Sequence, residues 1–193
     1  MALFDLDGTI TRADTMLEYL AYAHGRAKLA WWLALVFPAW VLAKLGLAHH
    51  DTPKRMLVRL AFAGQQVAEQ EKTAHLFTLD KMPGLLREAA LERIWEHKRH
   101  GATVVIVTAS CSLWVEPWCR QHGLELLATE LETGDGRYTG RLRTPNCRGK
   151  EKVARIRAHL GDLSGLDIHA YGDTPGDKPM LALAREPHYK PFR

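Results

Sequence analysis

Acidic and hydroxyl side chains follow three short apolar runs of the sequence, at the points where each run ends. They are Asp5, Asp7 and Thr9 after the first run, Thr108 and Ser110 after the second, and Asp173, Thr174 and Asp177 after the third. If the runs are neighbouring parallel strands, their carboxyl ends meet at one edge of a sheet, where ligands bind. Four carboxylates gathered there would repel one another without a cation among them. An all-oxygen set suits Mg²⁺ better than zinc, so the sequence predicts a magnesium site.

An aspartate beside such a cation can act as a nucleophile on a phosphate ester. The attack brings like charges within about 4 Å, which costs about 4 kcal/mol at an effective dielectric near 20. The cation and a lysine would offset that repulsion, while backbone N–H groups and the Thr108 hydroxyl hold the phosphoryl oxygens. The residue types therefore favour phosphoryl transfer through a covalent aspartyl-phosphate.

The elements that must position these side chains alternate between strand and helix. Residues 2–6, 103–107 and 167–171 are apolar runs typical of buried parallel strands, because both faces of such strands are covered. Helical patterns over 85–101 and 153–161 each close at a glycine. Strand and helix in alternation predict an α/β fold with a doubly wound parallel sheet.

One long segment departs from that alternation. From Asp14 to Lys81 the periodicity is helical and we identify no convincing strand. We expect residues 14–81 to form an all-helical cap inserted into a discontinuous core of residues 1–13 and 82–193. A segment with turn residues between two extended pieces, residues 131–142, predicts a hairpin on the edge of the sheet layer.

Composition narrows the class of protein. The chain has 193 residues, 47% hydrophobic and 25% charged, which excludes global disorder. The net charge of +4 is mild and its basic residues are scattered, so we expect no nucleic-acid partner. Three cysteines without a CxxC pair predict no disulfide framework. Because the first residues already form a strand pattern, we expect no signal peptide and a cytoplasmic location, or a peripheral one at the inner membrane face.

The predicted cap contains an unusual apolar stretch. Residues 29–43 carry no charge and lie between Lys28 and Lys44, with Trp31, Trp32 and Trp40 among them. The stretch is shorter than the roughly 20 residues of a spanning helix, and Pro38 interrupts it. Two interpretations stay open: a buried cap helix, or a cap that contacts a membrane surface through residues 29–47.

Four motifs in order give the chain a family resemblance. They are DLDGT at Asp5–Thr9, the apolar strand ending at Thr108, a lysine on the helix after PNCRG, and GDTPGD at Gly172–Asp177. Together they resemble the haloacid dehalogenase superfamily of phosphohydrolases, in the branch similar to phosphoserine phosphatase. The resemblance implies a Rossmann-like core with a helical cap inserted straight after the first motif.

The resemblance also implies roles for individual residues. Asp5 would be the nucleophile, and Asp7 the general acid that then acts as a base. Asp5, the backbone carbonyl of Asp7, and Asp173 would hold Mg²⁺, with Asp177 as a further ligand or as a nearby acceptor. Phosphate-contacting residues would be Gly8, Thr9, Thr108, Ala109, Ser110 and a lysine, for which Lys150 and Lys152 are both candidates and family spacing favours Lys152.

The substrate is less well specified than the chemistry. Where phosphoserine phosphatases place a glutamate that holds the substrate amine, this chain has the shorter Asp14, and its cap is similar to the bacterial group that includes phosphatidylglycerophosphatase C. The leading hypothesis is a Mg²⁺-dependent phosphomonoesterase for a small or lipid-linked phosphate ester. The alternatives are a lipid phosphatase at the membrane surface, a phosphotransferase using the same intermediate, and a non-enzymatic membrane-docking module, which the intact motif set disfavours. The leaving alcohol and the oligomeric state stay open.

Overall fold

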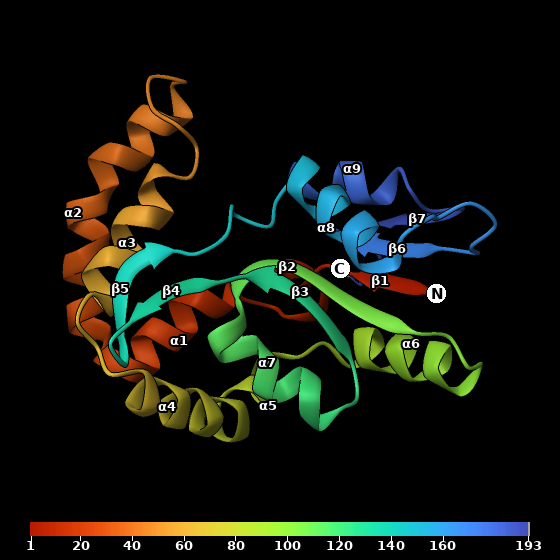
Figure 1. The fold of residues 1–193 in the computed structure, drawn as a ribbon, viewed down its shortest axis with the longest axis horizontal. Helices are drawn as coiled ribbons and strands as arrows, with labels where there is room; N and C mark the ends of the chain where they lie inside the picture. The colour runs from red at the N-terminus through yellow and green to blue at the C-terminus, as the bar shows by residue number, and fades with distance from the viewer. Residues whose placement is uncertain (193) are drawn as a thin grey trace.

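A computed structural model describes residues 1–192, and its centre is a parallel β-sheet (Figure 1). The strands are β1 (Ala2–Phe4), β2 (Val104–Cys111), β3 (Glu125–Thr129), β6 (His169–Gly172) and β7 (Glu186–Tyr189). Their order across the sheet is β3-β2-β1-β6-β7, and every neighbouring pair is parallel. The predicted doubly wound α/β fold is confirmed.

Alternate side chains of the central strands enter two separate cores. Phe4 and Ile106 face one cluster of buried residues, while Leu3, Val105 and Val107 face the other. Helices α6 (Glu88–Arg99) and α7 (Ser112–Gln121) cover the first face, and α8 (Lys150–Leu160) and the short α9 (Lys178–Leu181) cover the second (Figure 1). With both faces buried, these strands need no polar residue, which is why their sequences are apolar without alternation.

The three predicted strands are present with shifted bounds. The first ends at Phe4 instead of Leu6, because Leu6–Ile10 form a tight turn that contains Gly8. The second runs on to Cys111, and the third begins at His169.

The helical insertion is also confirmed. It consists of α1 (Thr15–His24), α2 (Arg26–Lys44), α3 (Thr52–Phe62) and α4 (Val67–Asp80), and the four-residue α5 (Met82–Leu85) leads back to the core. Tyr19, Phe62 and Trp114 stack with ring centroids 5.1–6.3 Å apart, which joins the insertion to α7 of the core. The division into core and cap at residues 13/14 and 81/82 stays a prediction.

The hairpin forms, but its predicted place was wrong. Strands β4 (Leu131–Gly134) and β5 (Arg137–Leu142) make a separate antiparallel sheet, not an extension of the parallel one. The hairpin packs on α3, where Gly140 lies so close to Ala63 that a Cβ atom would come within 2.8 Å of that side chain. The contact is tertiary, so the local sequence of the hairpin does not reveal it.

Candidate active site

Three carboxylates meet beyond the carboxyl ends of β1 and β6. Asp5 follows β1, Asp173 follows β6, and Asp177 ends the short 3₁₀ turn η2 (Pro175–Asp177). Each offers an oxygen that lies within 4.8 Å of the others, and all three residues are buried. Gly8 has φ = +85°, a conformation that favours glycine, and it lets the chain turn sharply after Asp5 and Asp7. The predicted gathering of acidic groups at this edge is present.

Lys152 supplies the positive charge inside this cluster. Its Nζ donates to Asp5 Oδ1 at 2.6 Å and to Asp177 Oδ1 at 2.7 Å, and the residue is 1% exposed. The two carboxylates hold the pKa of Lys152 above its ordinary value although burial works against the charged form. Of the two lysines that the sequence left open, Lys150 is exposed, so Lys152 is the one that reaches the carboxylates.

Thr9 links the remaining carboxylate oxygens. Its hydroxyl lies 3.2 Å from Asp5 Oδ2 and 3.2 Å from Asp173 Oδ1, and the residue is buried. The sequence predicted Thr9 as a phosphate-contacting residue. In the structure its side chain joins two of the acidic groups, and the phosphate contact stays a prediction.

Asp7 is held apart from that cluster, on the side of the helical insertion. Its Oδ1 accepts the backbone N–H of Thr15 at 2.7 Å, and its Oδ2 accepts the Ser110 hydroxyl at 2.6 Å. The Ser110 and Thr15 hydroxyls lie 2.9 Å apart, so the first turn of α1 and the end of β2 together fix this carboxylate. Asp5 and Asp7 therefore have different partners although only Leu6 separates them.

The surroundings raise the pKa of both carboxyl groups, Asp5 and Asp7. Burial raises the pKa of Asp5 to about 7, against the opposing charge of Lys152. Burial and the neighbouring charge of Asp14 raise the pKa of Asp7 to about 6, against the hydrogen bonds from Ser110 and Thr15. A carboxyl group with a pKa near 6 can both donate and accept a proton near neutral pH.

Both carboxylate oxygens of Asp177 already accept hydrogen bonds from other residues of the protein. Its Oδ2 accepts the backbone N–H and the hydroxyl of Thr174 at 2.8 and 2.7 Å, and its Oδ1 accepts Lys152. Burial disfavours the charged form, but Lys152 and Thr174 together hold the pKa of Asp177 below its ordinary value. Of the two roles that the sequence left open for Asp177, these contacts favour a positioning acceptor over a direct metal ligand.

The remaining predicted residues lie around the same place. Thr108 is fully buried within β2, three residues before its end, and its Oγ1 accepts the backbone N–H of Ser110 at 3.0 Å. Ala109 lines the pocket beside the carboxylates. Asp14 is exposed at the pocket rim, where its side chain accepts the N–H of Leu17 and caps α1.

A pocket of about 480 Å³ opens over these groups, and sequence reasoning missed part of its lining. The missed residues are Arg12, His50, Asp51, Lys54, Asn146 and Arg148. Lys54, from the start of α3, donates to the Ala109 carbonyl and to Asn146 Oδ1, and Asn146 donates to Asp51. Five of the six residues in HHDTPK, 49–54, are polar, and that run between two apolar helical stretches was the available signal.

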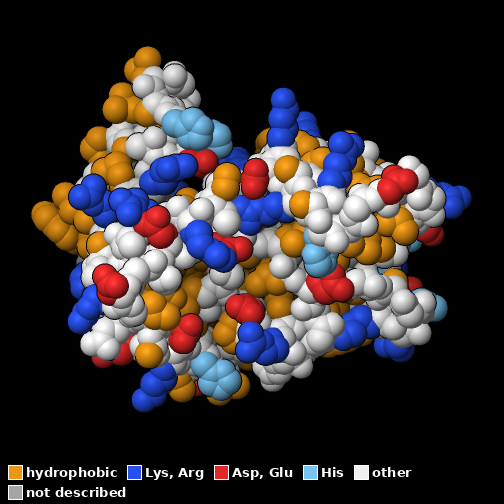
Figure 2. Space-filling model, viewed as in Figure 1, with side chains coloured by type: hydrophobic (Ala, Val, Ile, Leu, Met, Phe, Trp, Pro, Cys, Tyr) orange, Lys and Arg blue, Asp and Glu red, His pale blue; other side chains and the backbone are white. Residues whose placement is uncertain are grey.

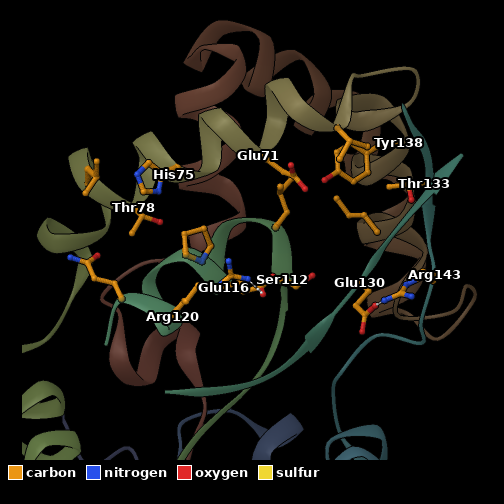
Figure 3. A pocket seen from close by; sticks show the side chains of 16 residues that line it. Glu71, His75, Thr78, Ser112, Glu116, Arg120, Glu130, Thr133, Tyr138 and Arg143 are labelled. Carbon is orange, nitrogen blue, oxygen red and sulfur yellow. Dashed lines mark hydrogen bonds and ion pairs between the residues drawn. The ribbon is translucent and has the colours of Figure 1, made fainter. Parts of the chain in front are cut away.

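A larger hollow of about 890 Å³ lies elsewhere, between α4, α7 and the β4–β5 hairpin (Figure 3). Glu71 and His75 reach it from α4, and the ion pair of Glu130 with Arg143 borders it. Its lining includes none of the carboxylates named above. The larger hollow is therefore not the candidate active site.

The residues fit a hard divalent cation. Asp5 and Asp173 present buried carboxylate oxygens to one place, and the third member of the cluster, Asp177, is a carboxylate as well. Such an oxygen set matches Mg²⁺ and does not match zinc, which takes nitrogen and sulfur ligands in most sites.

Comparison with known proteins agrees with this arrangement. The chain is 39% identical over 197 residues to Protein CicA of Caulobacter vibrioides, a match that covers 100% of this chain and 86% of CicA. It is 31% identical over 188 residues to a probable phosphatase of Mycobacterium tuberculosis, covering 93% of this chain and 64% of that protein. A solved structure of phosphoserine phosphatase with a phospho-aspartyl intermediate analogue superposes with a TM-score of 0.61 and 25% identity, over 95% of this chain and 82% of that one.

A family model described as haloacid dehalogenase-like hydrolase matches residues 2–182, nearly the whole chain. With the site at the expected sheet edge, the sequence match shows that the chain belongs to the haloacid dehalogenase-like hydrolases.

Proposed function

We propose that the protein is a Mg²⁺-dependent phosphomonoester hydrolase that works through an aspartyl-phosphate on Asp5. The observation that carries the proposal is the buried Asp5 carboxylate, held by Lys152 beside Asp173 at the mouth of a pocket. The probable phosphatase among the relatives and the phospho-aspartyl analogue among the similar structures support the same chemistry.

In this proposal Asp5 and Asp173 hold the cation with the backbone carbonyl of Asp7. When bound, Mg²⁺ would supply positive charge that offsets the repulsion between a carboxylate and a phosphate. The Lys152 ammonium, held by Asp177, offsets the same repulsion and keeps Asp5 Oδ1 in place.

The proton steps fall to Asp7. An Asp5 oxygen bonds to phosphorus while the bond from phosphorus to the leaving oxygen breaks, and protonated Asp7 gives its proton to that oxygen. Ionised Asp7 then takes a proton from a water molecule, whose oxygen attacks the phosphorus and frees Asp5 and inorganic phosphate. The raised pKa of Asp7, about 6, suits a group that must do both.

A phosphotransferase would use the same first step. In that case Asp7 would take its proton from an alcohol, and the phosphoryl group would pass to that alcohol instead of to water. Analysis of products with and without an added acceptor alcohol separates the two reactions.

Side chains from the helical insertion would select the leaving alcohol. Asp14, His50 and Lys54 face the pocket from that side, with Arg148 from the core. A lipid-linked phosphate ester is a second candidate substrate class, which the exposed apolar surface of α2 favours. A panel of phosphoserine, histidinol phosphate, sugar phosphates and phosphatidylglycerophosphate in mixed micelles compares these classes directly.

The test is phosphate release with Mg²⁺ over this panel. We expect EDTA to abolish release and added Mg²⁺ to restore it, and we expect Asp5→Asn to be inactive. Asp162→Asn is the matched control, because Asp162 is exposed and its side chain accepts hydrogen bonds from the neighbouring Ser164. Wild-type activity in Asp5→Asn would overturn the mechanism.

A further inference from the structure

The second helix of the insertion is apolar on its solvent side as well as on its packed side. Only Leu29, Trp32 and Val36 of α2 are buried, and they form a narrow stripe against the rest of the insertion. The large exposed side chains, which we call the α2 face, are Trp31, Leu33, Leu35, Phe37, Trp40 and Leu42, with Leu45 and Leu47 in the turn that follows. Trp31 is 64% exposed and Phe37 is 60% exposed.

A surface helix of a globular protein ordinarily turns charged and polar residues to water. Between Lys28 and Lys44, α2 has no charged residue on any side. Figure 2 shows hydrophobic side chains along the outer edge of the molecule at the left, where Figure 1 places α2. A contiguous exposed surface of this kind marks an interaction site.

The charged residues within and at the ends of α2 are all positive. Arg26 and Lys28 begin the helix and Lys44 ends it, and the sequence has no Asp or Glu from residue 19 to residue 50. The Lys28 and Lys44 ammonium groups lie 5.1 and 5.4 Å from the ring centroids of Trp32 and Trp40. Tryptophan and lysine side chains beside an apolar surface are the residue types that gather at a membrane–water interface.

The same charges disfavour a second copy of the chain as the occupant. Two α2 helices packed side by side in parallel would bring like cations together. In antiparallel packing, Arg26 and Lys28 of one copy would lie near Lys44 of the other. No acidic side chain in residues 19–50 could pair with them. An anionic lipid surface, by contrast, complements every charge on this face.

The sequence predicted a stretch too short to span and interrupted at Pro38, but α2 continues through Pro38 for 19 residues. Among the described residues it is the one helix that meets the length and hydropathy of a membrane span. Its buried stripe argues for lying on the surface instead. Trp32 packs edge-on to His24 of α1, with ring centroids 5.0 Å apart, and α2 also packs along α3. Crossing the bilayer would require these contacts to break.

We propose that the α2 face docks the protein onto the surface of an anionic lipid bilayer, with the helix axis in the plane of the interface. The face continues through Leu45 and Leu47, 67% and 72% exposed, to within three residues of His50, which lines the catalytic pocket. The proposal concerns binding and does not depend on the catalytic mechanism.

The experiment is co-sedimentation of the full chain with vesicles of phosphatidylcholine alone or with phosphatidylserine. We expect binding to the phosphatidylserine vesicles that weakens as salt is raised, since salt screens the cations. The triple variant Trp31→Ser/Phe37→Ser/Trp40→Ser should bind about tenfold more weakly or worse. The variant Lys28→Glu/Lys44→Glu tests the charges separately, and we expect a loss of about tenfold from two reversals.

The matched control is Leu76→Ser/Leu79→Ser, two exposed apolar residues on α4 outside the α2 face. It should bind vesicles as the wild type does. Release of phosphate from a soluble ester should stay at the wild-type level in every variant, which also reports that each one is folded. If the ester is not hydrolysed even by the wild type, circular dichroism reports folding instead, so failure of the proposed function leaves the binding result readable.

Three outcomes overturn the proposal. In the first, the wild-type chain stays in the supernatant with phosphatidylserine vesicles. In the second, the α4 control loses binding as much as the triple variant. In the third, light scattering finds a dimer that the triple variant breaks while neither protein binds vesicles, which assigns the α2 face to a second copy.

Discussion

At the scale of single residues, Lys152 holds together a site that would otherwise repel itself. Lys152→Ala would leave Asp5 and Asp177 buried without their shared cation. Removing one partner of a buried ionic group costs about 3–5 kcal/mol, and we expect a loss of that size in the free energy of unfolding measured with urea. Phosphatase activity should fall by at least about a hundredfold, because the nucleophile loses both its position and its counter-charge.

Lys150→Ala is the matched control for that prediction. Lys150 is exposed two residues away on the same helix, so its removal should change stability by no more than about 0.5 kcal/mol. Equal effects of the two substitutions would contradict the assignment of Lys152.

Ser110 affects the pKa of Asp7, the residue proposed as the general acid and base. Its hydroxyl donates to ionised Asp7 and so lowers the pKa of that carboxyl. In Ser110→Ala the charged form loses this support, so the pKa of Asp7 rises further, and the limb of the pH–rate profile that reports Asp7 should move to higher pH. Ser112→Ala, at the start of α7, should leave the profile in place. A profile unchanged in Ser110→Ala would show that Asp7 does not titrate in the rate-limiting step.

The site residues that could be predicted from the sequence are charged residues at motif positions. Asp5 and Asp173 were predicted from acidic side chains that follow apolar strands, and Lys152 was favoured by the motif spacing of the family that the chain resembles. Thr9 was assigned to the phosphate by the family resemblance, and that contact stays a prediction. Only coordinates show that its hydroxyl lies between two carboxylates. Lys54 was missed because its contacts with Ala109 and Asn146 join segments more than 50 residues apart.

At the scale of elements, the packing of the β4–β5 hairpin on α3 depends on a close contact at Gly140. Gly140 has φ = +80°, and an added Cβ atom would lie 2.8 Å from Ala63 Cβ and 3.2 Å from Arg59 Cα on α3. Gly140→Ala should therefore lose about 2–5 kcal/mol of stability, from backbone strain together with overpacking. Thermal and urea unfolding measure the loss.

Gly136 gives the control within the same hairpin. It has φ = +72°, but nothing lies within 4 Å of its added Cβ atom. Gly136→Ala should cost about 1–2 kcal/mol from the backbone alone. If the two substitutions cost the same, the hairpin does not press on α3 as described.

Strand prediction succeeded for the central strands and failed for the outer ones for one reason. Strands β1 and β2 have neighbouring strands on both sides and helices on both faces. Nearly all of their side chains are therefore buried, and their sequences are apolar. Strand β7 is an edge strand with the sequence EPHY and is mostly exposed. Its sequence therefore has no apolar run that would identify it as a strand. Strand β3, at the opposite edge, begins with an exposed glutamate.

At the scale of the whole molecule, a partly buried histidine links stability to pH. Burial, with the nearby charges of His169 and Arg93, lowers the pKa of His97 from 6.5 to about 4. Because the unfolded chain binds this proton more readily, the contribution of His97 is complete above about pH 6.5 and is lost as the pH falls toward about 4.

The free energy of unfolding should accordingly fall over that interval, and less steeply in His97→Gln. Urea titrations at pH 7, 6, 5 and about 4 measure the slope. His100→Gln, an exposed histidine three residues further on, should keep the wild-type slope. A variant of His97 with the wild-type slope would show that other groups carry the effect.

The account as a whole depends on phosphorus becoming bonded to Asp5. The most direct measurement is to quench the enzyme during turnover of a phosphate ester, reduce it with borohydride and locate the product by peptide mass spectrometry. Reduction of an aspartyl-phosphate gives homoserine, and we predict homoserine at position 5 only when substrate and Mg²⁺ are both present. Steady turnover with aspartate intact at position 5 in every quenched sample, or homoserine at position 7 instead, would contradict the account.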